Sequence, residues 1–146
     1  MYTVWKRTSP PPTMVIFDAP NRETCNVRRL QTNTPLQALV LQNDPQYLEA
    51  ARALGEIMAS TKTIKNGIET GLIRVGGRKP NPLELQILTS SFNQYRDSYS
   101  NRKKDAKSLI QIGESKPRVK DKIEEQAAWT LIASTLLNMD EFVTRQ

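Results

Sequence analysis

The chain has 146 residues, no histidine and one cysteine, and its formal net charge at pH 7 is +6. Without histidine there is no Ser-His-Asp triad, no Cys-His pair and no two-histidine zinc helix. A single cysteine excludes an internal disulfide, a Cys₄ zinc site and a c-type haem motif. No apolar run approaches the ~20 residues that a membrane helix needs, and apolar residues make up 38% of the chain. We therefore expect one domain, or part of one, with a small hydrophobic core.

Residues 1–34 show no helical period and are predicted to form a long non-regular, Pro-rich arm. Thr8–Pro12 ends in three prolines, which lack backbone N–H donors and favour an extended polyproline-type conformation. The aromatic and basic start, Tyr2–Arg7, does not fit a signal peptide. An extended segment cannot satisfy its own backbone groups. We expect the arm to lie on other surfaces, with Trp5 packing on polypeptide upstream of this chain.

Three pairs of a capping residue and a proline predict helix starts, at Thr34-Pro35, Asp44-Pro45 and Asn81-Pro82. The side chain of the first residue caps the helix, and proline fits its first turn, where a missing N–H costs nothing. Gly76-Gly77 predicts a helix end. The spacing of apolar residues then predicts helices over residues 35–42, 45–60, 62–75, 82–100, 103–112 and 119–138.

The last predicted helix is apolar almost all round from Ala127 to Met139, which is typical of a helix buried among others. We expect it to be the central helix, with four residues in the core: Ala127, Leu131, Ile132 and Leu136. The predicted fold is all-α, with about six helices in an orthogonal or irregular bundle. The arm over 1–34 belongs to the upstream part of the domain, and the bundle spans 35–146.

The segment from Arg102 to Lys122 holds eight basic and three acidic residues, so most of the net charge lies there. A basic segment is compatible with a nucleic-acid or anionic partner. It is also typical of a solvated polar face. Because no aromatic residue occurs between 102 and 122 on which a base could stack, we expect a solvated surface and not a nucleic-acid site.

The arm carries the densest cluster of polar residues. Guanidinium groups that converge on one place bind carboxylate, sulfate or phosphate, and a small anion or a carbohydrate is a possible ligand here. The alternative is that the arginines pair with acidic groups and carbonyls to fix the arm. The candidate binding residues are Arg7, Asp18, Arg22, Cys25, Arg28 and Arg29, with Lys6 and Glu23 beside them.

No residue is assigned a catalytic role. Basic neighbours lower the pKa of a thiol such as Cys25, but the chain offers no histidine as a base and a free cysteine is more often buried. Glycosidic cleavage needs two carboxylates that face each other across a cleft. The sequence offers three pairs of nearby carboxylates: Asp18 with Glu23, Glu124 with Glu125, and Asp140 with Glu141. Sequence neighbours on a helix do not face each other. No Asp-rich calcium loop occurs.

Residues 76–79, Gly-Gly-Arg-Lys, have some likeness to a phosphate-binding loop. They lack the Gly-Lys-Ser/Thr ending of such loops. We expect them to end a helix. The sequence thus predicts no metal site and no cofactor in this chain.

Four stretches together resemble one family. They are Tyr2–Pro12 (YTVWKRTSPPP), Phe17–Arg29 (FDAPNRETCNVRR), Thr32–Gln46 (TNTPLQALVLQNDPQ) and Leu137–Arg145 (LNMDEFVTR). They look like the C-terminal domain of unknown function of large secreted planctomycete-type proteins that often carry a cytochrome c-like domain. The likeness extends from end to end of this chain and implies that it is the C-terminal portion of a larger secreted or periplasmic protein. The haem motif Cys-x-x-Cys-His of such a domain does not occur here.

The resemblance implies no established activity. The leading hypothesis is a non-catalytic helical C-terminal module that packs on its missing N-terminal part, the upstream portion of the same protein. One alternative is half of an enzyme or carbohydrate-processing site completed by upstream residues, so an enzymatic role is left open. The other is a basic module that binds nucleic acid or another anion.

Overall fold

The computed structural model describes residues 10–20, 32–118 and 122–144. These ranges form an all-α fold of eight helices without a strand, and six of the helices have eight residues or more. The predicted class and the predicted number of substantial helices are therefore confirmed. The helices are α1 (Pro12–Ile16), α2 (Pro35–Asn43), α3 (Pro45–Ala59), α4 (Ile64–Gly76), α5 (Pro82–Asn101), α6 (Lys103–Ile110), α7 (Ile123–Leu137) and α8 (Asp140–Val143).

The three predicted cap-and-proline starts open α2, α3 and α5. The side chains of Thr34, Asp44 and Asn81 accept hydrogen bonds from backbone N–H groups of the first turn, at 3.3, 2.8 and 2.7 Å. Each such bond satisfies one of the donors that a helix start leaves free. A glycine also ends α4 as predicted, because Gly77 adopts φ 70°, a left-handed conformation that suits glycine.

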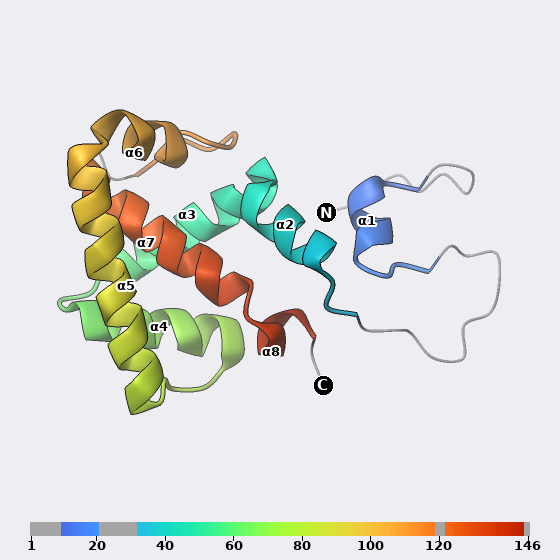
Figure 1. Ribbon diagram of the computed structural model, residues 1–146, viewed down its shortest axis with the longest axis horizontal. Coiled ribbons are helices and arrows are strands. Elements are labelled where there is room, and N and C mark those ends of the chain that lie inside the picture. Colours follow the sequence, from blue (N-terminus) through green and yellow to red (C-terminus); the bar gives the residue numbers. More distant parts are fainter. Residues whose placement is uncertain (1–9, 21–31, 119–121, 145–146) are drawn as a thin grey trace.

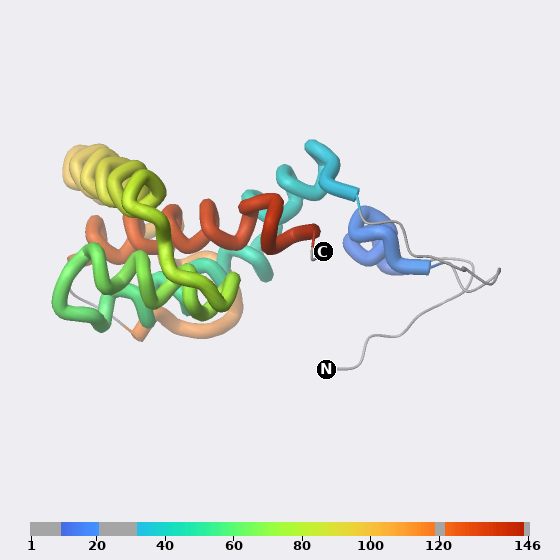
Figure 2. The backbone as a smooth tube through the Cα atoms, turned by 90° about the horizontal axis from the view of Figure 1, so that it is seen from below, coloured from blue at the N-terminus to red at the C-terminus, as the bar shows by residue number. Residues whose placement is uncertain are grey.

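Helix α7 is the centre of the bundle (Figure 1). It packs most extensively on α3 and then on α5 and α6. In the perpendicular view it runs between α5 on one side and α3 and α4 on the other (Figure 2). Fifteen residues form α7, and nine of them are buried. The main core contains Met58, Ile68, Leu72, Leu88, Phe92, Trp129, Ile132 and Leu136.

Of the four residues of α7 that the sequence predicted to lie in the core, three are buried. Ala127, Ile132 and Leu136 are fully buried, whereas Leu131 is only half-buried. The prediction for Leu131 was wrong because an almost uniformly apolar helix gives no period from which its exposed side can be read. The helix also begins at Ile123 and not at residue 119, since Lys122 has φ 58° and precedes the first turn.

Two glycines face α7, one against its backbone and one against the side chain of Trp129. A β-carbon added to Gly55 of α3 would lie 3.0 Å from the backbone nitrogen of Thr130. A β-carbon added to Gly67 of α4 would lie 2.6 Å from the indole ring of Trp129. The indole also packs on Phe92, with ring centroids 4.4 Å apart. The missing side chain of Gly55 thus lets α3 approach the backbone of α7, and that of Gly67 leaves room for the indole ring.

A second, smaller core lies beneath α6. Ala106 and Ile110 of α6 pack with Ala127 of α7, and all three are buried. Tyr99, Leu109 and Ile123 border this cluster and are partly buried. Two of its three buried residues are alanines, so it has little apolar surface with which to hold α6 in place.

The N-terminal arm is not wholly non-regular, which corrects the prediction. Pro12 occupies the first turn of the short helix α1, after Pro11 in an extended conformation. Proline fits a first helical turn as readily as a polyproline segment, so the run of three prolines did not exclude a helix that begins at the last of them. Helices α1 and α2 lie side by side and extend from the bundle on the side away from α5 and α6 (Figure 1). The division of the chain at residue 34 stays a prediction.

Candidate functional site

A polar network joins α1 to the start of α2. The carboxylate of Asp18 accepts hydrogen bonds from the backbone N–H and the hydroxyl of Thr32, at 3.0 and 2.6 Å. Asp18 has φ 56°, a left-handed conformation that aspartate tolerates better than most residues. Among the candidate binding residues, Asp18 is the one that lies in the described part of the chain, and here it binds a threonine.

Gln37 is the centre of this network. Its side chain is buried and donates to the carbonyl of Ile16 at 2.8 Å and to the hydroxyl of Thr32 at 3.0 Å. Its carbonyl oxygen accepts from the backbone N–H of Thr34 at 2.9 Å, which completes a capping box. The sequence analysis missed Gln37, although the spacing Thr34-x-x-Gln37 is the signal of such a box. These polar contacts join the arm to the start of α2.

Helix α2 buries one polar side chain and exposes two large apolar ones. Gln37 is 1% exposed, whereas Leu36 and Leu39 are 53% and 57% exposed. Val15 of the adjoining α1 is also 52% exposed. A surface helix normally buries its apolar stripe. We call these three residues, Val15, Leu36 and Leu39, the α1–α2 apolar surface.

The other candidate residues of the arm, Arg7, Arg22, Cys25, Arg28 and Arg29, lie outside the described residues, as do Lys6, Glu23 and Trp5. Whether the arginines converge on an anion therefore stays a prediction.

The remaining carboxylate pairs do not act together. Glu124 pairs with Lys103 at 3.2 Å, while its neighbour Glu125 pairs with Lys122 at 3.5 Å. Asp140 accepts from the side-chain amide of Asn33 at 2.5 Å, and Glu141 pairs with Arg78. Each carboxylate thus has its own partner.

The Gly-Gly-Arg-Lys segment is a helix end, as expected, and its arginine binds carboxylates. The guanidinium of Arg78 donates to both oxygens of Glu84, at 2.8 and 2.6 Å, and to both oxygens of Glu141, at 3.1 and 2.5 Å. These bonds raise the pKa of Arg78 above its usual value. Hydrogen bonds from Arg78 and from the backbone of Asn81 lower the pKa of Glu84 to about 2. Arg78 therefore connects the end of α4 to α5 and α8.

A second polar arrangement, which the sequence did not reveal, fixes the loop over 113–118 on α3. Glu49 accepts the backbone N–H groups of Glu114 and Ser115, each at 2.9 Å, and also the hydroxyl of Ser115. Arg52, whose side chain is 2% exposed, donates to the carbonyl and hydroxyl of Ser115 at 2.8 and 2.7 Å. The Ser115 hydroxyl and the two N–H groups lower the pKa of Glu49 from 4.5 to about 2.

The basic segment is largely solvent-exposed where it is described. Lys103, Lys104 and Lys107 of α6 are exposed, and so are Lys116 and Arg118 of the loop. Two of these cations are near carboxylates of other helices, since Lys103 pairs with Glu124 and Arg118 lies 4.0 Å from Glu56. That this face is not a nucleic-acid site stays a prediction.

The described ranges contain no group of three or more cysteine and acidic side chains that could hold a metal ion. Within these same ranges, no helix has the length and apolar character needed to cross a membrane.

The fold and these contacts define an all-helical module whose polar clusters mostly hold its own segments together. By comparison with known families, the chain belongs to PSD1, a family of proteins of unknown function (DUF1553), which it matches over residues 1–92. The first three of the four stretches quoted above lie within the match, and the closing stretch lies outside it. No curated protein and no solved structure matches the chain significantly.

Proposed function

We propose that this chain is a non-catalytic helical module that packs, through the α1–α2 apolar surface, on an upstream portion of the same polypeptide. The observation that carries the proposal is the arrangement of α2, in which Gln37 is buried while Leu36 and Leu39 are more than half exposed. Clustered exposed apolar side chains are typical of an interaction surface. Burying a leucine side chain contributes about 1.5–3 kcal/mol, so two leucines form a substantial anchor.

A non-catalytic role is supported by the residues themselves. The sequence lacks histidine, the commonest general base. The polar side chains of Asp18, Gln37, Glu49 and Arg52 bind backbone groups and hydroxyls of neighbouring segments. These contacts support a structural role for the four side chains.

The proposed setting is a larger secreted or periplasmic protein of the planctomycete type. The support is the resemblance of the quoted stretches together with membership of the PSD1 family. In relatives with a cytochrome c-like domain, the haem would be bound by residues outside this chain, because Cys-x-x-Cys-His does not occur in it.

The test is binding between two separately produced parts of the full-length protein, this 146-residue chain and the polypeptide upstream of it. Isothermal titration calorimetry should give a measurable Kd for the two natural sequences. The double variant Leu36→Ser/Leu39→Ser should weaken binding by at least about tenfold, given the burial energy of leucine.

The matched control is Leu83→Ser/Ile87→Ser, which changes two residues of α5 that are 64% and 55% exposed. It removes similar apolar area elsewhere on the surface and should leave the Kd unchanged. Equal weakening by both double variants, or no binding between the natural parts, would contradict the proposal.

A further inference from the structure

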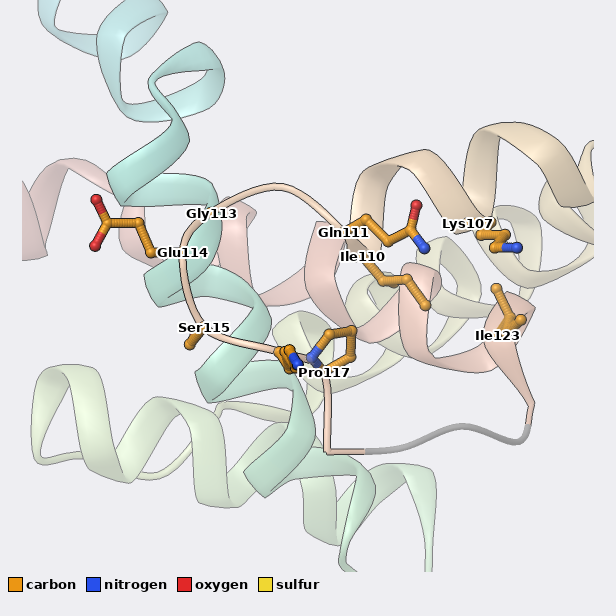
Figure 3. A pocket seen from close by; sticks show the side chains of 9 residues that line it. Lys107, Ile110, Gln111, Gly113, Glu114, Ser115, Pro117 and Ile123 are labelled. Atoms are coloured by element: carbon orange, nitrogen blue, oxygen red, sulfur yellow. The ribbon is translucent and has the colours of Figure 1, made fainter.

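We propose that the pocket between α6, the loop over 113–117 and the start of α7 binds a small amphipathic anion, meaning a compact apolar group that carries one carboxylate or sulfonate (Figure 3). The pocket has a volume of about 540 Å³, which lies within the range of sites for small molecules. This site is separate from the α1–α2 apolar surface and does not depend on the function proposed above.

The floor of the pocket is apolar. It includes Ile110, Pro117 and Ile123. Ile110 is 4% exposed and belongs to the smaller core beneath α6, on which Ile123 also packs. The pocket is therefore an opening at the edge of that small core, and an apolar group placed in it would extend the core. Such burial gives an apolar ligand most of its binding free energy.

The loop that forms one wall of the pocket is held in place by hydrogen bonds to α3. The backbone of Glu114 and Ser115 is bonded to Glu49 and Arg52 of α3. In Figure 3 the carboxylate of Glu114 points away from Gln111 and Lys107, on the far side of the loop. A wall fixed by other contacts leaves the pocket formed without a ligand, and a preformed site loses less free energy on ordering when it binds.

The polar groups around the apolar floor favour an anion. Lys107 of α6 and Lys116 of the loop both line the pocket and are exposed. Among the described residues, neither lysine forms an ion pair. Gln111 adds a carboxamide, whose nitrogen is a hydrogen-bond donor. Glu114 also lines the pocket, so the polar groups comprise two cations, one carboxylate and an amide, and the excess of cations complements an apolar group with one negative head.

The experiment is a titration of the ¹⁵N-labelled 146-residue chain with 1-naphthoate, followed by two-dimensional NMR. The expected result is saturable shifts of the amide signals of Gln111, Gly113 and Ile123. The neutral isostere 1-naphthamide should bind about tenfold more weakly, since two exposed charge contacts are worth up to about that factor. The double variant Lys107→Gln/Lys116→Gln should weaken binding of naphthoate similarly and leave that of naphthamide unchanged.

The matched control is Lys104→Gln, which removes an exposed charge from α6 that does not line the pocket. It should bind naphthoate as tightly as the natural chain does. The proposal would be overturned by equal affinity for naphthoate and naphthamide, by shifts confined to α1 and α2, or by the absence of saturable shifts. A loss in Lys104→Gln equal to that in the double variant would also overturn it, because the anion would then respond only to the overall charge.

Discussion

Gly67 of α4 lies directly against Trp129 of α7, and a β-carbon at position 67 would also come within 2.8 Å of the carbonyl oxygen of Met58. Replacing Gly67 with alanine gains helix propensity of about 1 kcal/mol. The crowding on both the indole and a backbone carbonyl should outweigh this gain. We expect Gly67→Ala to lower the free energy of unfolding by about 1–3 kcal/mol, measured by urea denaturation.

The control is Asn66→Ala, one position earlier in the same helix, where the side chain is exposed. It should leave stability nearly unchanged or raise it slightly. A stabilised Gly67→Ala variant would mean that α4 and α7 can separate without cost.

Ile132 and Leu131 are neighbours on α7 with different environments. Ile132 is fully buried in the main core, so Ile132→Ala should lower the free energy of unfolding by about 2–5 kcal/mol. Leu131 is half-buried, and Leu131→Ala should cost markedly less. Thermal and urea melts of the two variants would compare them. Equal losses would show that α7 is oriented differently about its axis.

The contacts of Glu49 predict a pH-dependent contribution to stability. Its pKa is about 2 in the folded chain and 4.5 in the reference state. A lowered pKa contributes stability above the reference value and loses it as the pH falls towards the folded value. At pH 7 Glu49→Gln should therefore be less stable than the natural chain, and the difference should shrink between about pH 5 and pH 2.

The measurement is urea denaturation of both chains across this pH range. Glu114→Gln is the matched control, because it changes an exposed carboxylate in the same loop and keeps the backbone N–H that Glu49 binds. Its stability difference from the natural chain should stay small at every pH. A difference for Glu49→Gln that grows on acidification would contradict the geometry of the loop.

Gln37 should determine whether α1 stays attached to α2. Gln37→Ala leaves the carbonyl of Ile16 and the N–H of Thr34 without their partner. Such a loss costs about 1–3 kcal/mol for buried groups. Hydrogen exchange should then become faster in Pro12–Ile16, while α7 keeps its protection. The exposed residue Gln42 supplies the control, and Gln42→Ala should not change exchange in α1.

Local signals in the sequence were enough to predict three helix starts and one helix end. A cap followed by proline marked three helix starts, and Gly77 marked an end, because these residues act on the backbone next to them. The burial of α7 followed from its composition. Its exact orientation did not, since the exposure of Leu131 depends on which neighbours cover each side.

Contacts between distant segments could not be predicted from the sequence. Glu49 and Ser115 are 66 positions apart, and nothing near either residue indicates the other. Arg52 lies within a predicted helix, and nothing in the sequence around it indicates that the loop buries its side chain. The role of Gln37 could have been predicted, because the spacing Thr34-x-x-Gln37 is a local signal of a capping box.

The two close glycines of the bundle place different limits on how related chains can vary. Gly67 meets a side chain, so a larger residue at 67 becomes acceptable when the residue at 129 becomes smaller, and the two positions should change together. Gly55 meets the backbone of α7, at Trp129 and Thr130. No substitution on α7 removes backbone atoms, so relatives that keep this helix pair should keep glycine at position 55, whatever occupies the positions opposite it.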